Sequence, residues 1–138
     1  MSVETNKATV QRFAEEVLNQ HQLQKLQDFA APDYTNHDPK GDITQGPQNL
    51  TALRSASPDA RVTITQILGE GDFVAVQWTS TGTHQQPLSL MPSDFAKPAT
   101  GRSTSITGMW LFRFEGDKIA EIWSHWDRHH LLKQISAE

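Results

Sequence analysis

Two turn motifs divide the second half of this chain into alternating runs, and that pattern constrains the fold more than any other feature. Gly69-Glu-Gly71 and Glu115-Gly-Asp-Lys118 each separate segments rich in β-branched and aromatic residues. Within the segments, apolar and polar side chains alternate with the period of two that is typical of strands. Strands joined by such short turns are antiparallel neighbours. The predicted strands cover residues 61–68, 72–84, 103–114 and 119–127.

The first half of the chain has helical spacing instead. Apolar residues three and four apart predict a helix from Val3 to about Gln20. A second, short helix covers residues 22–29 and ends before Pro32, because the residue preceding a proline disfavours helical backbone. A third, also short, begins at Gln45-Gly-Pro47. Helices followed by antiparallel strands predict an α+β domain with helices on one face of a curved sheet.

Size and composition narrow the class of protein. A chain of 138 residues that is 36% hydrophobic suits one domain spanning residues 1–138. No stretch approaches a membrane span and the N-terminus lacks signal-peptide features, so we expect a cytoplasmic protein without a membrane partner. The absence of cysteine excludes thiolate nucleophiles and disulfides. The net charge of −4, with no Lys/Arg cluster, argues against nucleic acid as a partner.

The last predicted strand carries the residues best suited to chemistry. With strict alternation, one of its faces holds Glu121, Trp123, His125 and Asp127. The other face holds Ala120, Ile122, Ser124 and Trp126. A carboxylate, an imidazole and an indole on one strand face are what a half-buried acid/base pocket needs, so we predict that the first face lines such a pocket.

Asp127 and His125 are the candidate catalytic residues. Trp123 and Trp126 would remove water from Asp127, and desolvation raises the pKa of an aspartate toward a range useful for general acid/base catalysis. The alternative is that Asp127 caps a helix that follows it. His125 could position Asp127 or move a proton, or it could simply bond to a backbone carbonyl.

Further candidates for substrate binding lie elsewhere in the chain. Asn36 and His37 could donate hydrogen bonds to an enolate oxygen, with Tyr34 anchoring them. The alternative for residues 34–41 is a polar surface loop. His84 could point into the same cavity or only end a strand. Trp123 could stack on a flat ligand, whereas core and dimer-interface packing explains the other tryptophans.

A metal site is not predicted. Four possible ligands are close in sequence: His125, Asp127, His129 and His130. Zinc, however, requires three or four converging ligands, and the chain has no recognisable ligand-rich motif.

Several short motifs, in their order along the chain, resemble one family. They are Tyr34-Thr-Asn-His-Asp-Pro39, Ser57-Pro-Asp-Ala-Arg-Val-Thr-Ile64, Gly69-Glu-Gly-Asp-Phe-Val-Ala-Val-Gln-Trp78, Gly82-Thr-His84, Phe112-Arg-Phe-Glu-Gly-Asp-Lys-Ile119, Trp123-Ser-His-Trp-Asp-Arg128 and Leu131-Leu-Lys-Gln134. Together they resemble the SnoaL-like polyketide cyclases (ester cyclases) of the nuclear transport factor 2-like superfamily. The resemblance covers nearly the whole chain.

The resemblance implies a cone in which a curved, mostly antiparallel sheet wraps around helices and encloses one deep pocket. Members usually dimerise through the outer sheet face, so it also implies a homodimer. The family's cyclases close a ring by intramolecular aldol condensation, with an aspartate as acid/base and no cofactor. Three departures from the family pattern fall where the pocket mouth is expected, at Gln86, residues 92–98 and His130. The identity of the substrate is therefore not implied.

Two functions remain open at this point. The first is a cofactor-independent lyase or isomerase that uses Asp127 to cyclise or isomerise a hydrophobic carbonyl compound. The second is a non-catalytic dimeric domain that binds a lipophilic ligand or a protein partner. Relatives of this fold have many functions, so fold alone does not decide between them.

Overall fold

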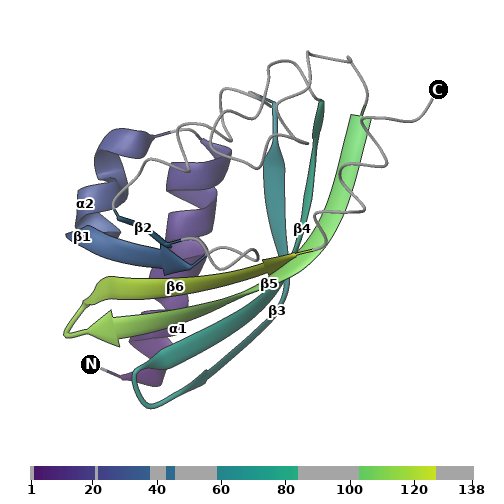
Figure 1. The fold of residues 1–138 in the computed structure, drawn as a ribbon. Coiled ribbons are helices and arrows are strands. Elements are labelled where there is room, and N and C mark those ends of the chain that lie inside the picture. The colour runs from purple at the N-terminus through teal and green to yellow at the C-terminus, as the bar shows by residue number, and fades with distance from the viewer. Residues whose placement is uncertain (1, 21, 38–42, 46–58, 84–102, 127–138) are drawn as a thin grey trace.

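A computed structural model of the chain describes residues 2–20, 22–37, 43–45, 59–83 and 103–126. Its helices are α1 (Val3–Arg12), the π-helix η1 (Phe13–Asn19), the 3-10 helix η2 (Leu23–Lys25) and α2 (Leu26–Phe29). Its strands are β1 (Ala30–His37), β2 (Ile43–Gln45), β3 (Arg61–Glu70), β4 (Phe73–Thr83), β5 (Ser103–Glu115) and β6 (Lys118–Trp126). In the described ranges the strands form one curved sheet of order β2-β1-β6-β5-β4-β3, with the helices on its concave side (Figure 1). The predicted α+β architecture is confirmed.

The first predicted helix is present, but its second half is a π-helix. Val10, Phe13, Ala14 and Val17 are all buried, as their spacing predicts. The wider π turn also turns Asn19 inward, where its side chain binds both backbone groups of Val62. Asn19 Oδ1 accepts from Val62 N at 2.6 Å, and Asn19 Nδ2 donates to Val62 O at 2.9 Å. The end of η1 is therefore tied to the edge strand β3.

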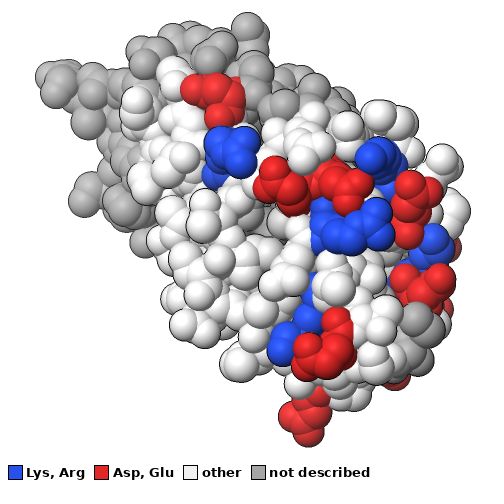
Figure 2. Space-filling model, turned by 180° about the vertical axis from the view of Figure 1, so that it is seen from behind, with Lys and Arg blue, Asp and Glu red and all other residues white. Residues whose placement is uncertain are grey.

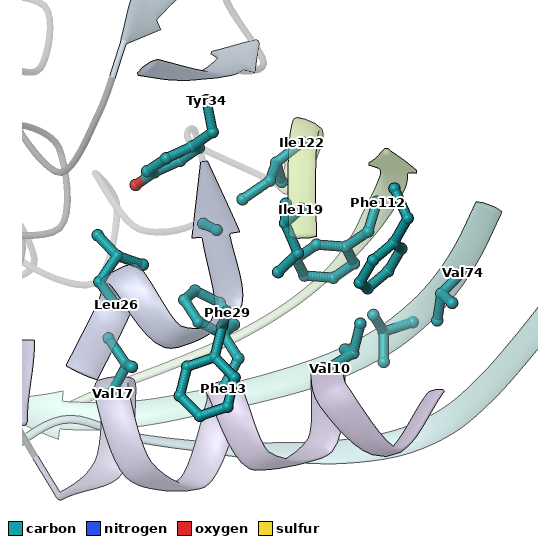
Figure 3. Packing of buried hydrophobic residues seen from close by; sticks show 13 residues of the cluster. Val10, Phe13, Val17, Leu26, Phe29, Tyr34, Val74, Phe112, Ile119 and Ile122 are labelled. Carbon is teal, nitrogen blue, oxygen red and sulfur yellow. The ribbon is translucent and has the colours of Figure 1, made fainter. Parts of the chain in front are cut away.

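The hydrophobic core lies between α1–η1 and the central strands (Figure 3). Phe13 meets Phe112 edge-on with ring centroids 6.0 Å apart. In β4, β5 and β6 the cluster contains Val74, Val76, Phe112, Phe114, Ile119 and Ile122, and β1 adds Ala30 and Tyr34. The alternation in β4 and β5 therefore predicts their buried faces correctly.

The two predicted hairpins are present. β3 pairs with β4 and β5 pairs with β6, both antiparallel. Gly71 and Gly116 have φ values of 58° and 61°, a left-handed conformation that costs glycine little. The tight turns fix the register of these two strand pairs, and with it which of their residues face the core.

The prediction of a polar loop at residues 34–41 is wrong as far as His37. The chain there belongs to β1, which pairs in parallel with β6 and antiparallel with β2. The alternation of apolar and polar residues that marks a strand is not visible in β1, because its inward residue Asn36 is polar. Pro32 lies where the β1–β6 register shifts between Ala30 and Thr35, which is where a strand tolerates proline. Most of the predicted third helix, residues 46–58, lies outside the described residues.

Charges of both signs are mixed on the face shown in Figure 2. Among the ion pairs of the described residues, Glu16 has Arg12 Nε at 2.9 Å and Lys25 Nζ at 3.0 Å. Basic side chains on this face are neighbours of acidic ones and do not form a separate positive patch among the described residues. In the described ranges, no helix is both long and apolar enough to span a membrane.

Candidate functional site

A buried polar pair lies on the concave face where β1 runs beside β6. Asn36 is 4% exposed and Ser124 is 8% exposed. Ser124 Oγ donates to Asn36 Oδ1 at 3.1 Å. In this amide orientation, Asn36 Oδ1 accepts the hydrogen bond from Ser124. The other end of the amide, Nδ2, is a hydrogen-bond donor.

Tyr34 precedes Asn36 by two residues and shares its face of β1. Its phenol ring packs beside Leu26 and Ile122, and its oxygen points away from Ile122 and Phe112 (Figure 3). The hydroxyl is buried and has no hydrogen-bond partner among the described residues. Burial raises the pKa of Tyr34 to about 12, because the phenolate would lose its hydration. Tyr34 therefore remains a neutral hydrogen-bond donor at any physiological pH.

Two tryptophans continue the concave face beyond this polar pair. Trp78 on β4 and Trp110 on β5 lie with ring centroids 5.0 Å apart. Gly108 is the cross-strand partner of both Trp78 and Trp126. A Cβ at Gly108 would lie 2.5 Å from Trp78 Cζ2 and 2.7 Å from Trp126 Cβ. The glycine therefore provides the space in which the Trp78 indole lies across β5.

The convex face carries a different cluster. The rings of His37 and Trp123 stack with centroids 5.1 Å apart and planes 4° apart. Glu121 lies between two bases, with Oε2 2.6 Å from His37 Nε2 and Oε1 accepting from Arg113 Nε at 3.0 Å. The hydrogen bond with His37, followed by that with Arg113, lowers the pKa of Glu121. This carboxylate is held in its ionised form and is a poor proton acceptor at neutral pH.

Apolar side chains surround that cluster on the convex face. Met109 is 52% exposed, Phe73 is 40% exposed and Leu111 is 36% exposed. Leu111 is the cross-strand partner of Trp123, and the Phe73 ring lies 6.4 Å from the Trp123 ring. These four residues, Phe73, Met109, Leu111 and Trp123, are called the convex patch below.

The structure divides the predicted site residues between the two faces. Tyr34 and Asn36 lie on the concave face, whereas His37, Trp123 and the exposed His125 lie on the convex face. His84 and Asp127 lie outside the described residues. The predicted alternation along β6 is present from Glu121 to Trp126, but the face expected to line the pocket is the outer one, because buried Ile122 and Ser124 belong to the face that turns toward the core.

Sequence reasoning did not single out Ser124 or Trp78 as site residues. Both were placed in predicted strands, but not as polar groups of a site. The burial of Ile122 identifies the inward face of β6, and Ser124 is on it. The available signal was the more apolar character of the face that carries Ala120, Ile122 and Trp126.

The described residues also line an open hollow, but they hold no metal centre. An open depression of about 460 Å³ lies at one end of β3, β4 and β5, lined largely by threonine and serine side chains. Its carboxylate, Asp59, accepts hydrogen bonds from Thr83 N and Thr83 Oγ1, both at 2.9 Å, which lowers the pKa of Asp59. Within the described ranges, no three His, Asp or Glu side chains gather as metal ligands would.

Solved structures similar to this chain share its fold throughout. A protein of Jannaschia sp. CCS1, proposed to be a SnoaL-like polyketide cyclase, is 20% identical with a TM-score of 0.84 and covers 98% of this chain and 94% of its own. AclR of Streptomyces galilaeus, proposed to be a hydroxylase, is 22% identical with a TM-score of 0.82 and covers 99% of both chains. A protein of Acidithiobacillus ferrooxidans, proposed to be a polyketide cyclase, is 26% identical with a TM-score of 0.80 and covers 98% of this chain and 97% of its own.

Family comparison gives the classification. None of the curated proteins matches this chain. The sequence profile of the SnoaL-like polyketide cyclases matches residues 8–135, which is nearly the whole chain. The match agrees with the curved sheet described above. The chain belongs to the SnoaL-like polyketide cyclase family.

Proposed function

We propose that this protein is a small-molecule enzyme that cyclises or isomerises a hydrophobic carbonyl compound on the concave face, without a cofactor. The observation that carries the proposal is the buried, unpartnered hydroxyl of Tyr34 beside the Asn36–Ser124 pair. Burying a donor without a partner costs about 1–3 kcal/mol. A ligand oxygen at this point would offset that cost. Family membership supports this reaction class. So does the similarity to the protein of Acidithiobacillus ferrooxidans, which is itself proposed to be a polyketide cyclase.

The proposed reaction begins with proton abstraction from a carbon next to a carbonyl group. Asp127 is the proposed base; it follows Trp126, the last residue of β6, so the alternation that places His125 on the convex face ends before it. The C–H electron pair becomes a C=C bond and the carbonyl oxygen becomes an enolate oxygen. Tyr34 Oη–H and Asn36 Nδ2–H donate to that oxygen, where negative charge develops. The enolate carbon then attacks a second carbonyl group, whose oxygen takes the proton back from Asp127, or a conjugated enolate takes that proton back at another carbon.

The convex residues have no direct part in this proposal. His125 is exposed beside Met109, and His37 is engaged with Glu121 and Trp123. We assign them to the surface of a homodimer, in which the convex patch would be covered by a second copy. Exposed side chains as large as Met109 and Leu111 support such an interface.

The alternative function is a non-catalytic dimeric domain that binds a lipophilic ligand or a protein partner. The same convex patch supports it, because an exposed apolar face suits a foreign protein as well as a second copy. Under this alternative, Asp127 has a structural role and the concave donors only hold a ligand. The two functions differ in whether any carbon acid loses a proton on the protein.

Hydrogen–deuterium exchange in D₂O tests the proposal directly. The panel holds aromatic β-keto esters, β,γ-unsaturated ketosteroids and simple cyclic ketones, and the proteins are wild type and Asp127→Asn. Exchange by wild type that the variant loses, at unchanged dimer content, would support Asp127 as the base. Binding of a panel compound without any exchange above buffer would support the alternative function and contradict the enzyme.

A further inference from the structure

A second buried donor on the concave face has no use in the reaction just proposed. Trp78 is 6% exposed, and its indole Nε1–H has no hydrogen-bond partner among the described residues. Unpaired buried donors are uncommon in folded proteins, because their desolvation is not compensated. Tryptophan has only this one polar atom, and its burial without an acceptor requires a reason.

Local packing fixes where the nitrogen-bearing edge of this indole lies. Cζ2, bonded to the carbon that carries Nε1, is the indole atom that a Cβ at Gly108 would meet, at 2.5 Å. That edge therefore lies over the β5 backbone at Gly108, between β4 and Trp126 of β6. The ring of Trp110, 5.0 Å away, packs against the same indole. Because Gly108 has no side chain, the nitrogen-bearing edge of the Trp78 indole has room to lie over the middle of the sheet.

Tyr34 and Trp78 cannot serve the same ligand atom. β1 and β4 are separated by β6 and β5, so their axes are three strand spacings apart, roughly 14 Å. A ligand that satisfies both donors must carry two acceptor atoms, with an apolar body between them. Trp110, between these positions on β5, offers an aromatic surface to such a body.

We propose that Trp78 is a specificity-determining residue that donates its indole N–H to a second oxygen of the bound small molecule. The inference rests on the proposed function, because it uses the same concave site. It adds the chemical class of the ligand: an elongated, mainly apolar compound with at least two oxygen acceptors, of which Tyr34 and Asn36 hold one and Trp78 holds the other. Compounds with a single carbonyl group would bind more weakly and in more than one orientation.

Indole N–H signals in a nitrogen-labelled sample provide a test. The chain has four tryptophans, so Trp→Phe variants assign each signal. The probes are 4,4′-diphenoquinone, whose two oxygens lie at opposite ends of an elongated apolar body, and biphenyl, the hydrocarbon with the same carbon skeleton. We expect the quinone to move the Trp78 signal downfield, as a new hydrogen bond does, and the hydrocarbon not to do so. Trp123, on the convex face, is the internal control and should not move with either probe.

Binding affinities provide the second readout. Loss of one net hydrogen bond in Trp78→Phe should weaken quinone binding roughly 2- to 12-fold and leave the hydrocarbon unaffected. Should this variant fold poorly, benzothienylalanine at position 78 replaces the N–H by sulfur in a ring of nearly the same shape.

The outcomes separate the two proposals. Quinone binding that Tyr34→Phe weakens, with the Trp78 signal and the Trp78→Phe affinity unchanged, would overturn the role of Trp78 and leave the concave site intact. Failure of both probes to bind at any accessible concentration would count against the concave site as a whole, and the role of Trp78 would fall with it.

Discussion

The two faces of this sheet are formed by the same strands, yet they differ in how their polar groups are satisfied. On the convex face, Glu121 is paired on both sides, by His37 and Arg113. On the concave face, the Tyr34 hydroxyl and the Trp78 indole N–H are buried and have no partner among the described residues. Satisfied polar groups stabilise a fold, whereas buried unsatisfied donors are available to a ligand. The comparison therefore places the chemistry on the concave face, despite the richer set of ionisable residues on the convex one.

The largest expected effect concerns the only tyrosine of the chain. Burial raises the pKa of Tyr34 to about 12, whereas that of an exposed tyrosine is about 10, so its affinity for the proton rises roughly a hundredfold. Ultraviolet absorbance of tyrosinate should therefore show a midpoint near that value in the folded protein. Because the pKa of Tyr34 is higher in the folded than in the unfolded state, its contribution to folding stability is complete below about pH 10. That contribution is lost as the pH rises through the folded pKa. A midpoint near 10 in a protein that is still folded would mean that the concave hydroxyl is solvated.

Gly108→Ala should be the most destabilising of the small changes. Its Cβ would meet Trp78 Cζ2 at 2.5 Å and the His125 carbonyl oxygen at 2.8 Å, and backbone oxygen cannot move aside cheaply. Overpacking of this kind lowers the free energy of unfolding by about 1–3 kcal/mol, measurable by urea denaturation. Thr107→Ala, next to it on β5 and outward-facing, is the matched control and should change stability much less. Equal effects at the two positions would remove the distinction between the faces.

The convex patch should respond in assembly and not in catalysis. Leu111→Ala removes apolar area from the proposed dimer interface in both copies, so we expect dimer dissociation to become roughly tenfold easier. Analytical ultracentrifugation across a dilution series measures it. Gln11→Ala, at an exposed position of α1 on the other side of the sheet, is the control. A wild-type protein that is monomeric at all concentrations would contradict the interface.

The smallest expected effect is that of Glu121→Gln. The pair with His37 and Arg113 is half-exposed, so its loss should cost at most about 1 kcal/mol at pH 7. Because these partners lower the pKa of Glu121, its contribution is present above the unfolded value and is lost as the pH falls through the folded value. The difference between variant and wild type should therefore begin to shrink at about pH 4.3, the ordinary pKa of glutamate, and vanish only below the lowered pKa of the folded state. Denaturation midpoints as a function of pH would show this, and a difference that persists in acid would assign the effect to packing.

The sequence predicts most of the fold because its strands alternate and its turns are glycine-centred. Val74, Val76, Phe112 and Phe114 repeat with period two, and they are buried as predicted. β1 was missed because Asn36, an inward residue, is polar and Pro32 suggests a chain break. No local pattern reveals that β1 pairs with β6, which lies more than eighty residues further along the chain.

The candidate site could be predicted only in part. Tyr34 and Asn36 were identified from their residue types and their motif, and the structure adds their common face and their burial. The two faces of β6 alternate from Glu121 to Trp126 as predicted, but the face that was expected to line the pocket is the convex one. Trp78 could not be singled out because an indole in a strand usually packs as core, and only its unpartnered nitrogen distinguishes it.

The most direct test of the central claim compares two adjacent residues of β1 that face opposite ways. Asn36→Ala and His37→Ala would be measured for deuterium exchange into the carbon acid that wild type accepts best. Removing a donor to a developing oxyanion lowers the rate about 10²- to 10³-fold. We predict such a loss for Asn36→Ala, with His37→Ala within a few-fold of wild type at equal dimer content. A large loss for His37→Ala with Asn36→Ala unaffected would place the chemistry on the convex face and contradict this account.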